Sequence, residues 1–237
     1  MMLKNTMRQG LTLAFALWVT ACGSSINQAN KTDIDARAAA LTNGSASFAA
    51  PSGFSPMPIA VGQWAEYYNV DDDGKSSFMT MKIVGQQGNA FWFENESKTY
   101  YGTTASLMLM EMGDRTNIDS VKVLASKTMD EKGQVQETPQ EIIGMMQSMM
   151  KNNAIGLVVN WANQQQETTS VPAGTFANCY KARSDVSVMG IKMSAMVWGH
   201  PEVPISGTVK SEGIGEKNSM TLVGFGTTGA KSVFPGM

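Results

Sequence analysis

The sequence QWAEYYNVDDDGKSSFMTMKIV, residues 63–84, has the pattern of a β-hairpin. Its two halves are rich in aromatic, β-branched and methionine side chains, and Asp73-Gly74 lies in the polar segment between them. An Asp-Gly pair between two such runs is a strong local signal for a tight turn joining antiparallel strands. We therefore expect one strand over residues 63–70 and a second over residues 76–84.

Similar strand patterns continue on both sides of one helical segment. We expect further strands, separated by Gly and Pro, over residues 89–101, 107–112, 121–128, 175–183, 186–197, 207–212 and 219–225. Between the two groups the apolar period changes, so residues 139–151 should form a helix with Thr138 as its N-cap. One face of this helix carries Ile142, Met146, Met149 and Asn153, with Ile143, Met145 and Met150 beside it. Residues 155–164 extend the helix or form a second one. This order favours an α+β fold, in which a curved antiparallel sheet is covered by one or two helices.

The N-terminus has the order of a secretory signal. Lys4 and Arg8 precede an apolar stretch at residues 10–20, which suits a signal peptide and is too short to cross a bilayer. The sequence VTAC at residues 19–22 then resembles the lipobox of bacterial lipoproteins. That resemblance implies a diacylglycerol on Cys22, cleavage before it and acylation of the new amino group. An ordinary secretory signal that happens to end in a cysteine is the alternative.

We accordingly expect three parts: a signal peptide at residues 1–21, the lipidated Cys22 with a flexible, disordered linker to residue 60, and a single β-rich α+β domain at residues 61–237. The linker is rich in Ser, Asn, Ala, Gly and Pro, although residues 33–41 are compatible with a short helix. Gly23 stands where an aspartate signals inner-membrane retention in well-studied Gram-negative systems. The expected location is the cell envelope, lipid-anchored in the outer membrane on its periplasmic face or at the cell surface.

Composition excludes several classes of function. No other segment has the roughly 18 uninterrupted apolar residues of a membrane-spanning helix. The formal net charge is −2 and the sequence has no basic cluster, which argues against a nucleic-acid partner. With Cys22 lipidated, Cys179 has no cysteine partner within the chain, so we expect it to be a small buried apolar residue. A reactive thiol and an intermolecular bridge are the alternatives.

Two C-terminal stretches carry a second resemblance. They are VPAGTF at residues 171–176 with Cys179-Tyr180, and then Trp198, VPI at 203–205, Gly207, LVGFG at 222–226 and Gly229-Ala230. Together they are similar to the envelope half-barrel superfamily that includes the lipoprotein carrier and the outer-membrane lipoprotein receptor. This resemblance implies a half-barrel-like sheet wrapped around covering helices, with acyl chains held between the two layers.

Nineteen methionines are the compositional oddity of the chain. The candidates for lining a ligand site alternate along expected strands or cluster in the expected helix: Met79, Met81, Met108, Met110, Met145, Met146, Met149 and Met150. Methionine is flexible and polarisable, and it is common where an apolar surface adapts to varied ligands. Three interpretations stay open: an ordinary methionine-rich core, an adaptable pocket for an acyl chain, or a thioether site for Cu(I).

The residues that could carry catalysis or bind metal have simpler explanations. His200 is the only histidine, and no Gly-x-Ser-x-Gly motif supplies a nucleophile for it. One histidine and one free cysteine are too few for a zinc site. The sequence at residues 69–74 matches the start of a calcium loop, but Thr80 stands where the bidentate glutamate belongs, and a hairpin turn explains the same residues. Glu94 and Glu96 lie two apart on one strand, where a solvated face accounts for them better than an acid–base pair.

The sequence thus predicts a non-enzymatic, lipid-anchored envelope protein without a cofactor or metal. It would bind an apolar ligand, such as an acyl chain or a lipidated partner protein. The alternative is an accessory or structural outer-membrane lipoprotein that docks on another envelope protein and has no ligand of its own. A cavity between helix and sheet would favour the first hypothesis, and a packed core with an exposed apolar patch would favour the second.

Overall fold

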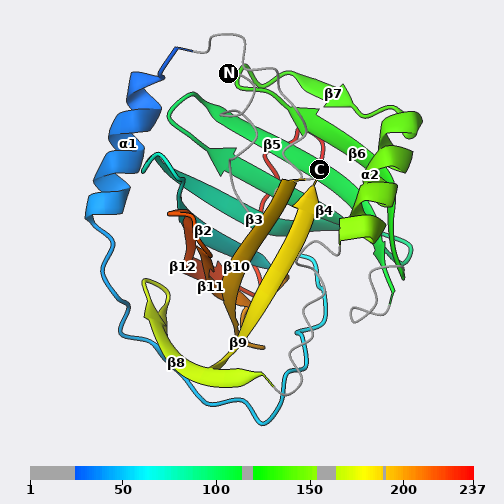
Figure 1. Ribbon diagram of the computed structural model, residues 1–237. Helices are drawn as coiled ribbons and strands as arrows, with labels where there is room; N and C mark the ends of the chain where they lie inside the picture. Colours follow the sequence, from blue (N-terminus) through cyan, green and yellow to red (C-terminus); the bar gives the residue numbers. More distant parts are fainter. Residues whose placement is uncertain (1–24, 114–119, 154–163, 189–190) are drawn as a thin grey trace.

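The computed structural model describes residues 25–113, 120–153, 164–188 and 191–237, and Figure 1 shows their arrangement. The helices and strands within these ranges are α1 (Gln28–Ala39), β1 (Ser47–Phe48), β2 (Trp64–Val70), β3 (Ser76–Gln87), β4 (Ala90–Lys98), β5 (Thr103–Met112), β6 (Val121–Met129), β7 (Val135–Glu137), α2 (Gln140–Asn153), β8 (Gln165–Val171), β9 (Gly174–Val188), β10 (Ile191–Gly199), β11 (Thr208–Gly213) and β12 (Ser219–Gly226). The residues of the lipobox lie outside the described part of the chain.

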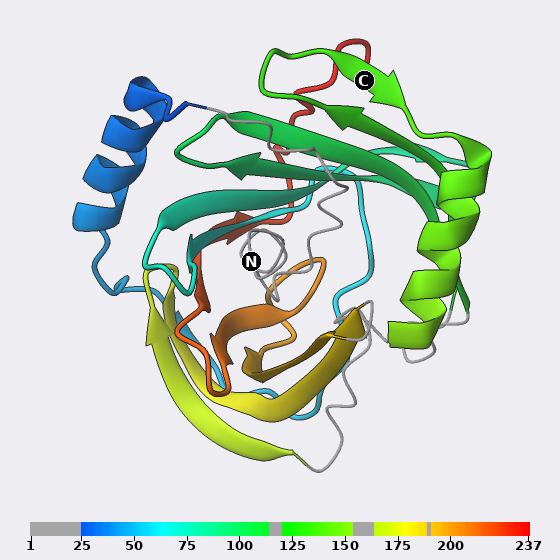
Figure 2. The same ribbon diagram turned by 45° about the horizontal axis from the view of Figure 1, so that its top comes forward.

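The strands form one curved sheet. Its order is β1-β9-β10-β11-β12-β2-β3-β4-β5-β6-β7, with β8 also paired to β9, and each of these pairs except β1–β9 is antiparallel. The sheet bends until β9 and β10 face the arm formed by β3 to β6 across an interior, and it does not close into a barrel (Figure 2). The predicted α+β fold with a curved antiparallel sheet is confirmed.

Helix α2 spans the opening between the two arms of the sheet (Figure 2). It contacts β6 on one side and β9 on the other. The Gln147 side chain supplies the free edge of β6 with hydrogen bonds: its Oε1 accepts from Val123 N at 2.7 Å, and its Nε2 donates to Val121 O at 2.6 Å. The helix therefore closes a sheet edge that would otherwise leave backbone groups unpaired. Within the described residues, no helix has the length and apolarity needed to cross a bilayer.

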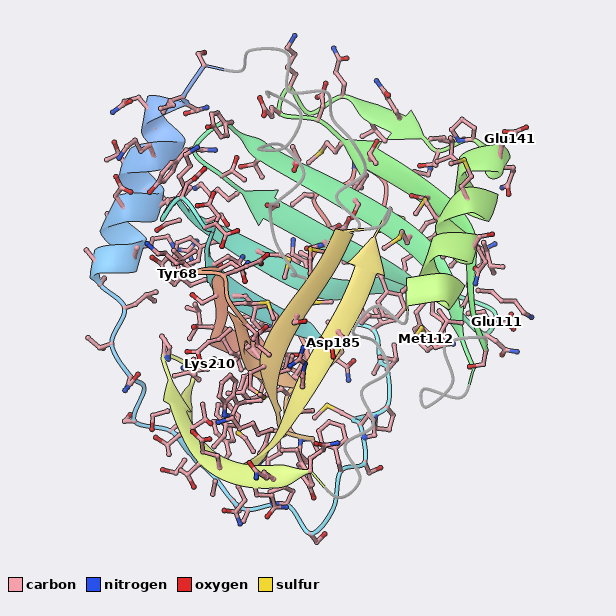
Figure 3. All side chains as sticks on the ribbon, viewed as in Figure 1. Tyr68, Glu111, Met112, Glu141, Asp185 and Lys210 are labelled. Atoms are coloured by element: carbon pink, nitrogen blue, oxygen red, sulfur yellow. The ribbon has the colours of Figure 1, made fainter. Side chains whose placement is uncertain are left out.

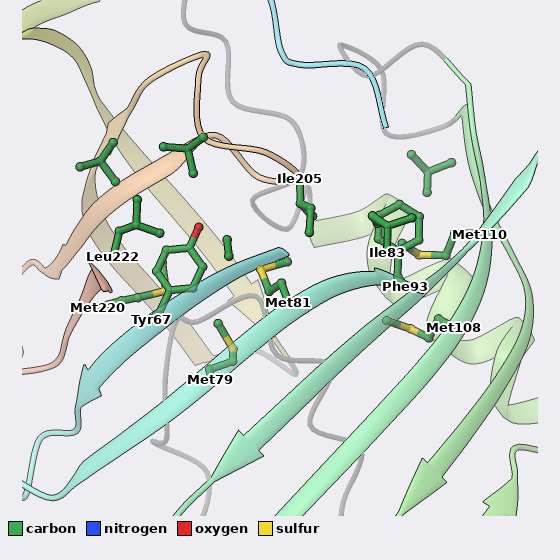
Figure 4. Close-up of a cluster of buried hydrophobic side chains, with 14 of the residues drawn as sticks. Tyr67, Met79, Met81, Ile83, Phe93, Met108, Met110, Ile205, Met220 and Leu222 are labelled. Atoms are coloured by element: carbon green, nitrogen blue, oxygen red, sulfur yellow. The ribbon is translucent and has the colours of Figure 1, made fainter. Parts of the chain in front are cut away.

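Strand alternation gives the sheet an apolar interior face. Ala65 and Tyr67 on β2 lie opposite Met81 and Met79 on β3, and all four are buried in one cluster with residues of β4, β5 and β12 (Figure 4). Successive side chains of a strand point to opposite faces, so Trp64, Glu66 and Tyr68 lie on the outer face. The two C-terminal motifs also join the core: Phe176 re-enters it after the turn at residues 171–174, where Gly174 has a φ of +140°.

The outer face of β3 to β5 is covered by the C-terminal segment. Phe234 is buried there with Ala105 and Leu107, and Trp92 packs against this second cluster. The segment is held by Glu94, which accepts from the Ser232 hydroxyl and from Val233 N at 3.1 Å. The expectation of a solvated face for Glu94 is therefore wrong, because residues distant in sequence cover it.

Residues 25–60 differ from the expected flexible linker. They contain helix α1 and strand β1, and both pack on the sheet. Arg37 lies 3.8 Å from the ring centroid of Phe78 and donates to Glu66 at 2.8 Å, while Phe48 stacks on Phe176 at 4.2 Å between ring centroids. The segment is bound by charged and aromatic contacts, which its polar composition did not reveal.

Three other expectations needed correction. The short strands β7 and β8 were not predicted, and the expected strand at 186–197 is divided between β9 and β10. The buried face of α2 is also rotated from the predicted one, because Ile143 and Met146 are buried whereas Ile142 and Met145 are exposed. The expected continuation of the helix at residues 155–164 lies almost wholly outside the described residues.

Candidate functional site

The candidate site is the methionine-rich interior between the sheet and α2. Met79 and Met81 on β3, Met108 and Met110 on β5 and Met146 on α2 are all buried in the main core cluster (Figure 4). Five of the eight predicted residues are thus brought together from three elements that are distant in sequence. Such a surface is both apolar and able to change shape, because each methionine has three rotatable bonds.

The remaining predicted methionines do not add to this interior. Met145 exposes 61 % of its surface to solvent and points away from the core. Met149 and Met150 belong to α2, but their side chains lie outside the described part of the structure. Met220 was missed, although it is buried in the same cluster from β12. Its alternation with Leu222 in residues 219–225 was the available signal.

The cross-strand register arranges the interior side chains in rows that run across β3 to β6. One row is Ile83, Phe93, Met108 and Ser126; the next is Met81, Asn95, Ser106 and Thr128; the third is Met79, Ser97 and Thr104. Beyond the first row, toward the C-terminal end of β5, Met110 lies opposite Val123 and Met112 lies opposite Val121. The interior therefore changes along the strands, from an apolar region to a mixed region that carries amide and hydroxyl groups.

These two regions lie at opposite ends of the sheet. The hairpin turns at residues 71–75, 99–102 and 130–134 lie at one end, which we call the α1 end because α1 packs beside it. The opposite end, which we call the α2 end, carries Met112 at the end of β5. Figure 3 shows Tyr68 near α1 and Met112 near α2. The polar rows are thus displaced toward the α1 end, and α2 covers the apolar rows.

Among the residues that the structure describes, three polar atoms of the interior face are buried and have no hydrogen-bond partner. They are Oδ1 of Asn69, Oδ1 of Asn95 and Oγ of Ser126. Asn95 lies opposite Met81, and Ser126 lies opposite Met108, so both are set among the methionines. A buried polar group without a partner costs about 1–3 kcal/mol. Native proteins keep few such groups, and those that they keep are often satisfied by a water or a ligand.

Tyr67 closes the interior beside β11. Its hydroxyl donates to Thr208 O at 3.0 Å and lies 3.0 Å from the Ser206 Oγ. Burial raises the pKa of Tyr67 above its ordinary value, so the hydroxyl stays protonated and acts as a hydrogen-bonding group. These hydrogen bonds attach the loop that follows His200 to β2, in the middle of the sheet.

His200 is a buried residue that contributes to the packing of the core. The side chain is completely buried, with Nε2 3.1 Å from Ala49 O and Nδ1 accepting from Glu202 N at 3.3 Å. Its ring packs edge-on against Phe176 at 5.3 Å between centroids. Burial lowers the pKa of His200, so the neutral form is favoured. The residue ties the segment after β1 to the core.

The acidic turn at residues 71–74 uses its carboxylates to hold backbone N–H groups. Asp71 Oδ1 accepts from Asp73 N at 3.0 Å and from Lys75 N at 2.8 Å, and Asp72 Oδ1 accepts from Lys217 N at 2.9 Å. The turn interpretation therefore accounts for the residues that resembled a calcium loop. Across the described residues, no three His, Cys, Asp or Glu side chains are placed to hold a metal ion.

Glu94 and Glu96 share a cation. Lys82 Nζ lies 2.8 Å from Glu94 Oε1 and 2.6 Å from Glu96 Oε2, on the outer face of the sheet. Burial alone would lower the pKa of Lys82, but the hydrogen bonds to both carboxylates raise it above its ordinary value. Both carboxylates are bridged by this one lysine, and the C-terminal segment covers Glu94, so a structural ion-pair cluster accounts for these residues better than an acid–base pair.

Cys179 is buried, as predicted. Its thiol donates to Phe176 O at 3.6 Å, next to Asn178, whose φ of +53° marks an irregularity in β9. Burial raises the pKa of Cys179 to about 11. A thiol with such a pKa is a poor nucleophile at neutral pH.

Comparisons with known proteins give little guidance. No family model matches the sequence, and no curated protein matches it. Among solved structures, the fold is similar to a Bacteroides fragilis protein described as exported and as having a YmcC-like fold. The two share 12 % sequence identity with a TM-score of 0.36, over 75 % of this chain and 100 % of the other. A likeness at this level carries no conclusion about ligand or activity.

Proposed function

We propose that this chain is a lipid-anchored protein of the cell envelope that binds an amphiphilic ligand in its interior without catalysis. The observation that carries the proposal is the set of unpartnered polar atoms among buried methionines, Asn95 Oδ1 and Ser126 Oγ above all. The anchor rests on the lipobox resemblance at Cys22, and the outer membrane is the proposed location because Gly23 follows that cysteine.

The chemistry of the interior selects a class of ligand. The buried methionines provide an apolar, deformable surface along the interior, which suits an acyl chain. An amide oxygen accepts hydrogen bonds, so Asn69 and Asn95 each need a donor, and the hydroxyl of Ser126 can donate or accept. A lipid with a hydroxyl or an amide hydrogen near its polar end meets both requirements. We therefore favour a monoacylglycerol, a hydroxylated fatty acid or the acylated end of another lipoprotein.

A polar side chain without a hydrogen-bond partner in an apolar core lowers the stability of the ligand-free protein. Replacing Asn95 with an apolar residue of similar size would relieve a buried amide oxygen that has no partner. The cost of about 1–3 kcal/mol for each such atom is large compared with the 5–15 kcal/mol stability of an ordinary domain. A bound ligand that supplied the hydrogen-bond donors would remove this cost, and the free energy so recovered would add to its affinity.

The experiment is to purify the chain from Gly23 onward without detergent and to measure its mass under native conditions. Organic extraction and mass spectrometry of the extract then identify any bound lipid. Co-purified lipid near one molecule per chain supports the proposal. A ligand-free mass, together with no uptake of added monoacylglycerol or fatty acid, would contradict it. Ser126→Leu replaces the hydroxyl beside Met108 with a larger apolar side chain and should lose the lipid, whereas the exposed Met145→Leu should keep it.

A second candidate function is docking on another envelope protein, and one observation favours it. Leu124 on β6 and Ile142 and Met145 on α2 expose 44 %, 37 % and 61 % of their surfaces, on two elements that are in contact. Exposed apolar side chains on neighbouring elements are typical of an interaction surface. If the interior proves empty and takes up no lipid, this function becomes the better hypothesis. Crosslinking from Met145 in intact cells would then identify the partner.

A further inference from the structure

We infer that the α1 end of the sheet faces the surface of the bilayer in which Cys22 is anchored. This inference rests on the proposed acylation of Cys22. It adds an orientation, and it commits to a lipid surface as the partner of a defined part of the protein.

The first step is the length of chain between the anchor and the folded domain. Near the start of the described chain, Asn27 is held to the sheet: its N–H donates to Tyr100 O at 2.8 Å, and its side chain caps α1 by accepting from Asn30 N at 3.1 Å. Asn30 in turn donates through Nδ2 to Thr99 O at 3.2 Å. Asn27 lies five residues after Cys22, and five residues span at most about 18 Å when fully extended. The acylated cysteine therefore holds the start of α1 close to the lipid headgroups.

The second step identifies which surface is brought to the bilayer. Asn27 is bound to the turn at residues 99–102, which joins β4 to β5 at the α1 end. The turn at residues 130–134 lies against it, because a side chain at Gly102 would collide with that of Glu131. Figure 1 shows the N-terminal end of α1 beside this part of the sheet. The membrane-facing patch is thus defined by Ile26, the 99–102 turn and the 130–134 turn.

The third step is the chemistry of that patch. Ile26 exposes 53 % of its surface, and Tyr100 and Tyr101 are partly exposed beside it. Tyrosine is enriched at membrane–water interfaces because its ring is apolar and its hydroxyl is polar. A lysine lies over each of these two rings: Lys31 Nζ is 5.1 Å from the ring centroid of Tyr100, and Lys75 Nζ is 5.8 Å from the ring centroid of Tyr101.

Charge alone does not attract this patch to lipid. Lys31 is paired with Asp35, and Asp130, Glu131 and Lys132 lie in the second turn. The local charges of both signs leave no basic surface of the kind that binds anionic lipid. The anchor must therefore supply the attachment, and the patch determines the orientation.

This orientation also gives the interior of the sheet a direction relative to the membrane. The polar rows that contain Asn95 and Ser106 lie toward the α1 end, and the apolar rows lie toward α2. A lipid bound with its polar end among those rows would have its headgroup on the bilayer side and its acyl chain directed away from the membrane.

The experiment uses the full acylated chain in vesicles of phosphatidylethanolamine and phosphatidylglycerol that carry a short-range quencher on their headgroups. Two single-site variants report on opposite ends of the sheet. Lys132→Cys lies in the 130–134 turn at the α1 end, and Gln87→Cys lies at the α2 end. Both of these residues are exposed. Strand β4 has 9 residues, so the two ends are about 30 Å apart. The thiol of Cys22 is blocked by its acyl group and Cys179 is buried, so a dye reacts at the introduced cysteine.

We expect the dye at residue 132 to lose fluorescence and the dye at residue 87 to keep it. Equal loss at both sites, or greater loss at residue 87, would overturn the orientation. A third variant inserts 20 Gly and Ser residues after Ser25, which adds a flexible spacer of about 25 Å, and it should remove the difference. A difference that survives this insertion would refute the length argument.

The mass of the N-terminal peptide separates this inference from the proposals on which it rests. A peptide without acyl groups would overturn the anchor and the orientation together. An acylated peptide with equal quenching would overturn the orientation alone. Ligand binding is measured by extraction of the same samples, so it is tested independently of both.

Discussion

Ser126→Ala should stabilise the ligand-free protein while weakening its binding of lipid. Ser126 is 3 % exposed, and its Oγ is buried opposite Met108 on the neighbouring strand, without a partner in the described part of the chain. The substitution deletes this oxygen and leaves the backbone pairing of β6 with β5 unchanged. Because the buried hydroxyl costs about 1–3 kcal/mol, the variant should gain on the order of 1 kcal/mol after the loss of the small contacts that the oxygen makes.

The measurement is urea unfolding of the delipidated protein, followed by tryptophan fluorescence. The slope of free energy against urea should stay constant, so that the change in midpoint reports stability alone. Ser106→Ala is the matched control, because Ser106 is buried on the adjacent strand of the same face and its hydroxyl is not among the atoms left without a partner. This control should be neutral or destabilising.

The second half of the prediction concerns the bound state. If a lipid hydroxyl or amide pairs with Ser126, the variant loses that hydrogen bond, and its affinity for monoacylglycerol should fall about five- to tenfold, equivalent to about 1–1.5 kcal/mol. A loss of stability of 1 kcal/mol or more in the ligand-free variant would refute the reasoning. It would mean that the hydroxyl is already satisfied by an ordered water, and that the interior is a hydrated core without need of a ligand.

The remaining predictions concern stability and reactivity. Glu94→Gln should cost about 3 kcal/mol in urea unfolding, because it removes the completely buried charge that pairs with Lys82, and a loss under 1 kcal/mol would contradict this assignment. The more exposed Glu96→Gln is its control. In an NMR titration of this single histidine, the pKa of His200 should lie below its ordinary value of about 6.5. The stability that the neutral side chain confers is therefore complete above pH 6.5 and is lost as the pH falls from that value through the lower pKa of the folded state. A pKa at or above 6.5 would contradict this prediction. Cys179, with its pKa of about 11, should resist iodoacetamide at pH 8 until the protein unfolds, and rapid labelling of the native chain would exclude the buried position.

The strands were predictable because their signal is local. Alternation placed Met79 and Met81 on one face, and the turn at residues 71–75 joined β2 to β3 as expected. Helix α2 was also predicted, but its orientation was not. Gln147 is polar and therefore counted against the buried face, yet its amide is needed to pair with the open edge of β6. Hydrophobic periodicity alone does not identify a buried side chain whose function is hydrogen bonding.

Non-local contacts account for the larger failures. Helix α1 is too polar for its packing to be inferred from sequence, and it is held by contacts such as that of Arg37 with Phe78 and Glu66. Glu94 is charged, so its burial beneath Val233 depends on a segment that is distant in sequence. The same limit applies to the site. The methionines could be proposed one strand at a time, but the unpartnered Asn95 among them is visible only when the strands are paired.

The packing of residues 25–60 against the sheet has a direct consequence for function. A linker reaching residue 60 would let the domain turn freely, and the direction of its interior relative to the membrane would have no meaning. With Asn27 bound to Tyr100, the proposed acyl anchor would restrict the domain to one orientation. The polarity of the rows across β3 to β6 then acquires a direction relative to the membrane. The mixed rows that contain Asn95 and Ser97 lie toward the bilayer, and the row of Ile83 and Phe93 lies farther from it. A protein that only docked on a partner through α2 would gain nothing from unpartnered polar atoms in its interior, whereas a protein that binds an amphiphilic ligand would use them to hold the polar part of that ligand.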